Sequence, residues 1–126
     1  MAETLALPSN PETEPFWQAC RDRRFLVKRC EACGEAHWYP RSLCPFCFSA
    51  KTVWQPGDGR GTVYSFSIMR RVPEPYAIAY VTLAEGPTMM TNIVDCDFDA
   101  IRIGMAVTVD FKALDDGRVI PVFKPA

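Results

Sequence analysis

The sequence predicts a mainly β protein with a short N-terminal helical segment, a small cysteine-rich module and a C-terminal barrel of five short strands. Three observations support this fold class. Two CxxC units lie close together between residues 30 and 47, a glycine-rich segment follows at residues 56–61, and residues 62–123 hold five short segments of strand-like composition. A chain of 126 residues has the size of one domain, or of two very small ones.

Residues 1–29 are expected to form an N-terminal arm and a helix. Residues 1–12 contain two prolines and little periodicity, which indicates a flexible arm. Thr13 can cap a short helix, and Pro15 is tolerated in its first turn. Residues 25–28 are then predicted to form a short strand. The helix is expected to place its apolar residues on one face and to include Phe16, Trp17, Cys20 and Arg24.

Residues 30–55 are expected to form a metal-binding ribbon. Each CxxC unit brings two thiolates together at a tight turn, and two such turns supply the four sulfurs of a tetrahedral site. In a reducing cytosol such pairs bind metal more often than they form disulfides, and a thioredoxin-type redox site would need only one pair. Zinc is the expected ion, and iron fits the same geometry. The predicted ligands are Cys30, Cys33, Cys44 and Cys47.

A closed site of four thiolates has no open coordination position, so the metal is predicted to be structural rather than catalytic. About 40 residues could not otherwise bury enough surface to fold. His37, the only histidine, could replace a cysteine or act as a general base, but a packing or surface role is favoured. Cys20 and Cys96 are expected to be small packing residues. No nucleophile stands beside a base, so no catalytic residue is predicted.

Residues 56–126 are expected to form the barrel, after a hinge at residues 56–61. The predicted strands are 62–72, 77–83, 88–94, 106–114 and 119–123, with one helical turn or a loop at 98–104. Five strands in this order, with a long third connection, favour a five-stranded Greek-key barrel of the OB type over a sandwich fragment. The alternating aspartates at 95–99 resemble a calcium loop only loosely, because its central glycine and terminal glutamate are missing.

Alternation also predicts which side chains face inward. In the first barrel strand, one face is expected to hold Tyr64, Phe66 and Ile68, and the other Val63, Ser65, Ser67 and Met69. The second strand, residues 77–83, is apolar on both faces. The fourth strand is expected to point inward with Val107, Val109, Phe111 and Ala113.

The charge distribution argues against a general nucleic-acid binder. The net charge is −1 and the pI is about 5.8, whereas such domains are usually strongly basic. Residues 16–54 carry seven bases and three acids, and residues 55–126 carry seven bases and nine acids. A local basic patch could still meet a phosphorylated small ligand or an acidic partner. The sequence shows no membrane-spanning apolar run and no secretory-signal pattern, so a cytoplasmic location is expected.

Nearly the whole chain resembles the DUF35 family. The resemblance is carried by FWQACRDRRFLVKRCEACGEAHWYPRSLCPFC, GDGRGTVYSFSI, PYAIAYVTLAEGPTMMTNIVD, IGMAVTVDF and the final PVFKP. Members of this family are small OB-fold proteins with a rubredoxin-like zinc ribbon and an N-terminal helical segment. One departure is that Ser65 and Ser67 stand where relatives often have threonine.

The resemblance implies a non-catalytic accessory subunit of a thiolase-fold enzyme, a thiolase or aldolase acting on acyl-CoA in lipid or aromatic degradation, with acyl-CoA held at a shared site. Phe16 and Trp17 are then expected to contact the partner, because large aromatic side chains dominate interfaces. The alternative is that they pack onto their own barrel. Two competing functions are a nucleic-acid-binding module, disfavoured by the acidic barrel half, and an acyl-CoA hydrolase, for which no catalytic pair is visible.

Overall fold

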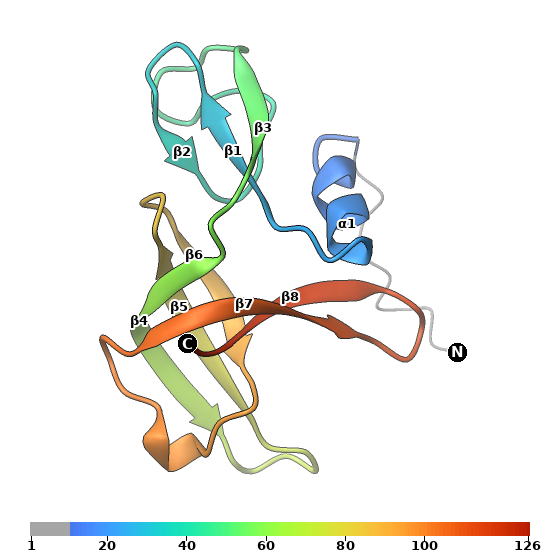
Figure 1. Cartoon of the computed structure of the whole chain (residues 1–126), viewed down its shortest axis with the longest axis vertical. Coiled ribbons are helices and arrows are strands. Elements are labelled where there is room, and N and C mark those ends of the chain that lie inside the picture. Colours follow the sequence, from blue (N-terminus) through green and yellow to red (C-terminus); the bar gives the residue numbers. More distant parts are fainter. Residues whose placement is uncertain (1–10) are drawn as a thin grey trace.

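In the computed structural model, which describes residues 11–126, a three-stranded ribbon stands on one end of a closed barrel and a helix lies beside both (Figure 1). Most of the predicted arm, residues 1–12, lies outside the described residues. The elements are α1 (Glu14–Arg21), β1 (Leu26–Cys30), β2 (Ala36–His37), β3 (Thr52–Pro56), β4 (Arg60–Met69), β5 (Tyr76–Leu83), β6 (Thr88–Ile93), the 3-10 turn η2 (Phe98–Ala100), β7 (Ala106–Ala113) and β8 (Val119–Pro125).

The helix begins as predicted but ends earlier. α1 follows Thr13 and has Pro15 in its first turn, although the Thr13 side chain makes no capping hydrogen bond. It ends at Arg21 rather than Arg24, because Arg23 adopts the left-handed conformation with φ 58°. The N–H groups of residues 23 and 24 then bond to the carbonyls of residues 20 and 19, which is the Schellman arrangement that terminates helices.

The ribbon sheet has the strand order β2-β1-β3, and both pairings of β1 are antiparallel. Lys28 lies at its centre, opposite His37 on one side and Trp54 on the other. The Lys28 Nζ sits 4.2 Å from the centre of the Trp54 ring, which stabilises the buried ammonium group by a cation–π interaction. Both outer strands therefore depend on one central strand that leads directly into the first CxxC unit.

The second sheet closes into a barrel with the order β4-β5-β6-β8-β7, in which β7 pairs with β4. Neighbouring strands are antiparallel except β6 and β8, which run parallel and meet at Ile93 and Phe123. η2 occupies the connection between β6 and β7, where a helical turn or a loop was predicted. The closed five-stranded barrel, the ribbon and the single short helix confirm the predicted fold class and exclude the sandwich fragment.

One predicted face of β4 is wrong, because the strand contains a β-bulge. Val63 pairs with Val81, and the next pair is Ser65 with Tyr80, so Tyr64 has no partner of its own. The extra residue shifts the alternation by one position. Val63 is therefore buried, Phe66 still packs against the core, and Tyr64 points outward with 67% of its surface exposed.

Two further predictions about strand faces also need correction. β5 alternates strictly instead of being buried on both faces, since its odd-numbered residues are buried and Tyr80 between them is 47% exposed. On β7, Val107, Val109 and Phe111 face the core as predicted, but Ala113 is exposed. It is the last residue of β7, beyond the part of the strand that packs on the core.

Helix, ribbon and barrel meet in a cluster of aromatic rings. Phe16 of α1 is fully buried and makes edge-to-face contacts with three rings. Its ring centre lies 5.0 Å from that of Trp17, 6.1 Å from that of Phe25 and 4.9 Å from that of Trp38. Phe25 in turn lies 6.2 Å from Phe123 of β8. Phe16 thus connects the ribbon, through Trp38, to the barrel.

The segment predicted to be a hinge is packed closely against the barrel. β4 already begins at Arg60, inside this segment. A Cβ atom added at Gly61 would lie 2.6 Å from Cγ1 of Val81 and 2.7 Å from the carbonyl oxygen of Thr82. Glycine is required here because the backbones of β4 and β5 approach too closely for a side chain.

We expect Phe16→Ala to lower the free energy of unfolding by about 3–5 kcal/mol, as for other buried phenylalanines, because it removes the ring that joins three parts of the fold. Urea denaturation of the full chain measures this loss. Leu43→Ala is the control, since Leu43 is 53% exposed and its truncation should cost about 0.5 kcal/mol or less. Equal, small losses for both variants would show that the aromatic cluster does not hold the parts together.

Candidate metal centre

The first CxxC unit forms a tight turn at the end of β1. Cys30 is the last residue of β1 and is buried, whereas Cys33 is exposed. The N–H of Gly34 donates to the carbonyl of Cys30 at 2.8 Å, and the N–H of Cys30 donates to the carbonyl of Glu35 at 3.0 Å. Gly34 has φ 82°, a conformation that glycine adopts without a steric cost. These bonds fold the chain back so that both thiols face the same side.

The second CxxC unit repeats this geometry. The N–H of Phe48 donates to the carbonyl of Cys44 at 2.9 Å, and the N–H of Cys44 donates to the carbonyl of Ser49 at 2.9 Å. Phe48 occupies the position of Gly34 and has φ 65°, which is unusual for a residue with a large side chain. Sequence reasoning missed this equivalence. Aligning CEACG with CPFCF would have revealed it.

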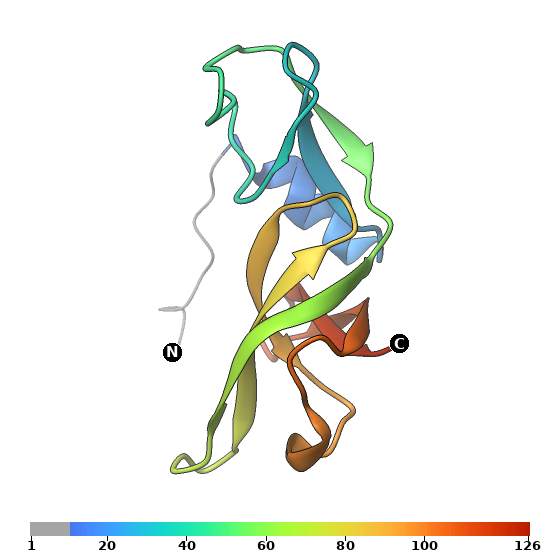
Figure 2. The same cartoon turned by 90° about the vertical axis from the view of Figure 1, so that its left-hand side faces the viewer.

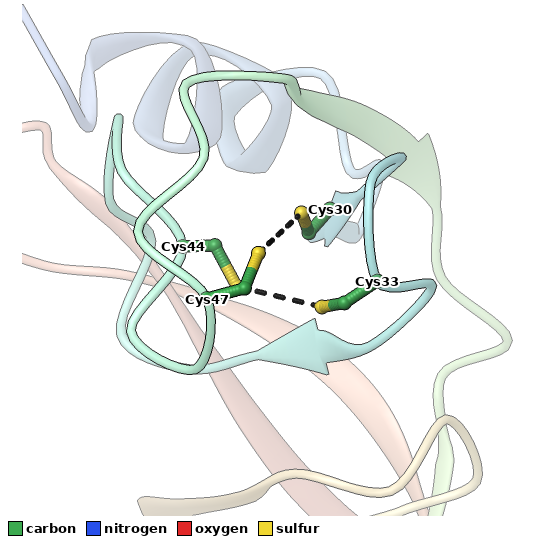
Figure 3. Close-up of side chains that lie close together, drawn as sticks. All are labelled: Cys30, Cys33, Cys44 and Cys47. Carbon is green, nitrogen blue, oxygen red and sulfur yellow. Dashed lines mark hydrogen bonds between the residues drawn. The ribbon is translucent and has the colours of Figure 1, made fainter.

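The four sulfur atoms converge at the centre of the ribbon (Figure 3). They all lie within 4.8 Å of one another. The Cys30 and Cys47 sulfurs are 3.6 Å apart, and those of Cys33 and Cys44 are 3.7 Å apart. A tetrahedral ion with metal–sulfur bonds of about 2.3 Å requires sulfurs roughly 3.8 Å apart. The arrangement therefore fits a four-coordinate ion closely.

The surroundings of Cys30 favour its thiolate form. Hydrogen bonding from the backbone N–H of Cys33, and more weakly from that of Ala32, lowers the pKa of the Cys30 thiol to about 7, against the desolvation that raises it. Thiolates are the form in which cysteine binds a metal.

The two other cysteines lie apart from this group. Cys20 lies on the buried face of α1, and burial raises the pKa of its thiol to about 12, so it is not a reactive nucleophile. Cys96 is partly buried between β6 and η2, where its thiol donates to the carbonyl of Asp97 at 3.3 Å. Both are packing residues in the structure, as the sequence indicated.

His37 is not part of the thiol group. It is 2% exposed on β2, and its Nε2 accepts a hydrogen bond from the N–H of Arg41 at 3.3 Å. A neutral imidazole that accepts at Nε2 carries its proton on Nδ1. Nδ1 has no hydrogen-bond partner among the described residues. Burial lowers the pKa of His37 below its ordinary value, so the ring is neutral at pH 7.

Several hollows flank the barrel. A cleft of about 430 Å³ separates the ribbon from the β5–β6 turn and is lined by residues that include His37, Trp38, Phe46 and Glu85. A larger cavity of about 590 Å³ opens near the connection from β6 to η2 and is lined by residues that include Glu74, Tyr76, Cys96 and Lys112. In the larger cavity the Cys96 thiol donates to the backbone carbonyl of Asp97 and not to the side chain of a base.

The structure separates the two residues predicted to contact a partner. Phe16 is fully buried in its own chain, which is the alternative that the sequence left open, and its ring is not available at the surface. Trp17 is partly buried at the edge of the same core. Of the pair, Trp17 is the one whose side chain retains exposed surface.

Two family models match consecutive parts of the chain. Residues 17–53 match the rubredoxin-like zinc ribbon domain of ChsH2, and residues 54–112 match the C-terminal OB-fold domain of ChsH2. Together with the four close thiols, the zinc ribbon match indicates a metal-binding site. No helix among residues 11–126 is long and apolar enough to cross a membrane.

Two similar proteins carry different names. A probable enoyl-CoA hydratase alpha subunit of Thermomonospora curvata is 35% identical over 94% of this chain, and the chain spans 39% of that relative's length. A DUF35 domain-containing scaffold protein of Methanocaldococcus jannaschii is 32% identical, over 86% of this chain and 85% of the relative. Among solved structures, a chain of the Ltp2-ChsH2(DUF35) aldolase is similar with a TM-score of 0.84 and 34% identity, over 94% of this chain and 98% of that one.

We expect Cys44→Ser to abolish stoichiometric metal binding and to unfold the ribbon, because a site with three thiolates loses both charge and geometry. Elemental analysis of the purified chain, together with the melting temperature, measures both effects. Cys96→Ser is the matched control and should retain the metal. A ribbon that folds normally with neither zinc nor iron bound would contradict this prediction.

His37 should make the stability depend on pH. Its pKa is lowered in the folded chain, so below about pH 6.5 the unfolded chain binds more protons, and stability falls as the pH decreases. We expect the melting temperature to drop between about pH 7.5 and 6 more steeply for the wild type than for His37→Gln. The resonances of this single histidine follow its protonation by NMR. A folded-state pKa at or above 6.5 would contradict the prediction.

Proposed function

The chain belongs to the DUF35 family, and on that premise we propose that it is a non-catalytic accessory subunit of a thiolase-fold enzyme that acts on acyl-CoA. The observation that carries this proposal is the likeness to the DUF35 chain of the Ltp2-ChsH2(DUF35) aldolase, which extends over nearly the full length of both chains. The scaffold-protein names of similar archaeal chains support the same role. A thiolase or an aldolase is the proposed partner.

The metal is proposed to be structural. Cys30, Cys33, Cys44 and Cys47 would hold one ion, for which we propose zinc, with iron as the alternative that the same four sulfurs accept. When bound, the ion closes the ribbon, since four thiolates complete a tetrahedral coordination shell. Cys30 and Cys33 belong to the turn between β1 and β2, and Trp38 follows β2 directly. An ion bound by these cysteines would therefore also help to hold Trp38 against Phe16 in the aromatic cluster.

We further propose that acyl-CoA is held at a site shared with the partner. The charge of the N-terminal half supports this, because residues 16–54 carry seven bases and three acids, and Arg41 and Lys51 are among the bases. Both side chains are exposed, so they can attract the phosphates of a CoA-linked substrate. Trp17 stays a proposed partner contact. The division into an arm and helix (1–29), a ribbon (30–55) and a barrel (56–126), and the cytoplasmic location, also stay proposals.

Affinity purification from the source cells tests the proposed function. We expect a tagged full-length chain to retain a thiolase-fold subunit, identified by mass spectrometry, and the reconstituted complex to process acyl-CoA. The isolated chain should release no free CoA from acyl-CoA, because no nucleophile–base pair exists within the described residues. Turnover by the isolated chain that a substitution within it abolishes would overturn the accessory role. So would the absence of any thiolase-fold subunit in the purified material.

A further inference from the structure

The outer surface of β4, β5 and β6 carries a continuous row of large exposed side chains. Tyr80 of β5 lies directly opposite Met90 of β6 and Ser65 of β4, and Tyr64 is the bulged residue beside Ser65. Tyr64 is 67% exposed, Tyr80 47% and Met90 61%. Figure 2 shows these three strands in front of β7 and β8. We call this row of Tyr64, Tyr80 and Met90 the tyrosine face.

The bulge in β4 lets Tyr64 lie on this face while Val63 and Phe66, on either side of it, both face the core. A regular strand would alternate from the buried Val63 through an outward residue 64 to an inward residue 65. Instead the two residues Tyr64 and Ser65 stand opposite Tyr80 alone, and Phe66 returns to the core. Bulges bend a strand and redirect a side chain at functional surfaces. Here the bulge widens the outward surface by one aromatic residue without removing an apolar residue from the core.

This face carries no charge. The outward residues of β5 and β6 are Tyr76, Ile78, Tyr80, Thr82, Thr88, Met90 and Asn92, and β4 has no charged residue from Thr62 to Met69. The outer surface of β7 and β8 differs, because Asp110 and Lys124 form an ion pair there at 3.5 Å. Exposed sheet surfaces in monomers usually carry charges that prevent association. An uncharged face rich in tyrosine and methionine has the composition of an interface centre.

The face ends in a groove. A hollow of about 220 Å³ lies here, with Ile78 and residues 89–92 on one side. Trp38 of the ribbon and Ile120 and Pro121 of β8 line the other side. The groove therefore connects the tyrosine face to the ribbon. A side chain from a docked protein could enter it beside Trp38, as anchor residues do in well-packed interfaces.

We propose that the tyrosine face is the docking surface for the thiolase-fold subunit, which covers it with an uncharged, largely apolar surface and places one side chain in the groove beside Trp38. This inference rests on the proposed function and names the surface that would bind the partner subunit. The absence of charge decides the chemistry of the partner. An acidic or basic surface would lose its hydration against this face without gaining a counter-charge.

A nucleic acid fits the tyrosine face less well than a protein does. OB barrels that bind single strands combine stacking aromatics with cations that follow the phosphates. The tyrosines are present here, but no cation stands among the outward residues of β5 and β6. The nearest arginine in sequence on β4, Arg60, is already bound to Asp58 at 2.8 Å.

The test introduces a charge into the tyrosine face of the full-length chain. Tyr80→Lys and Met90→Lys should each weaken binding of the purified thiolase-fold subunit by roughly 30-fold, the loss expected for a hot-spot residue. Ile103→Lys is the matched control, because Ile103 is 71% exposed in the loop between η2 and β7; it should leave the affinity within about twofold. Isothermal titration calorimetry measures affinity, and melting temperatures confirm that the variants fold.

A second measurement does not depend on the stability of the variants. A photo-reactive phenylalanine analogue at Tyr64 should cross-link to the thiolase-fold subunit, and the same group at Ile103 should not. If the wild-type chain binds the subunit but the lysine variants bind equally well and position 64 does not cross-link, the docking surface is wrong and the proposed function stands. If the wild-type chain binds no thiolase-fold subunit, both fail. Tight binding of an oligothymidine by the wild-type chain, competed by no protein, would assign the face to nucleic acid.

Discussion

The buried ring of Phe16 is the contact on which the arrangement of the whole molecule depends. The ribbon and the barrel have little direct contact with each other. Both pack instead against the aromatic rings that surround Phe16. Trp38 follows β2 of the ribbon directly, and Phe25 leads into β1 while it touches Phe123 of the barrel. The helix is therefore not an appendage. It supplies the ring that completes a core shared by three small elements, none of which could bury enough apolar surface alone.

The sulfur cluster compensates for the lack of a hydrophobic core around the two CxxC turns of the ribbon. The segment from residue 31 to residue 48 contains one two-residue strand and exposes Leu43, Phe46 and Phe48, so it has little core of its own. Four thiols within 4.8 Å of one another replace that core. The backbone bonds of the two turns hold the sulfurs at spacings that suit an ion, and the left-handed residues Gly34 and Phe48 allow both turns to close. A metal bound there would stabilise a fold that packing alone does not explain.

The outer surface of the barrel has two halves that differ in charge. α1 packs against β8, and the charged pair of Asp110 and Lys124 lies on the β7–β8 half. The β4–β6 half is uncharged and carries exposed tyrosine and methionine side chains. In the proposed accessory role, function would depend on which surfaces the chain presents and how rigidly it holds them. A closed barrel suits that role because every strand has two hydrogen-bonded neighbours and the outward side chains keep their relative positions.

The sequence by itself determined what depends on short spacings and strand alternation. The two CxxC units predicted the four thiols that converge, and five short strand-like segments with a long third connection predicted the closed barrel. Only the tertiary structure decided the rest. Tyr64 and Phe66 lie on opposite faces because a bulge against Tyr80 shifts the register between them, and a bulge arises from pairing with another strand, which alternation within one strand does not record. Phe16 lies inside because Phe25 and Trp38, which come from later segments of the chain, pack against its ring. An amphipathic helix shows which face is apolar, but what covers that face depends on contacts between residues far apart in the chain.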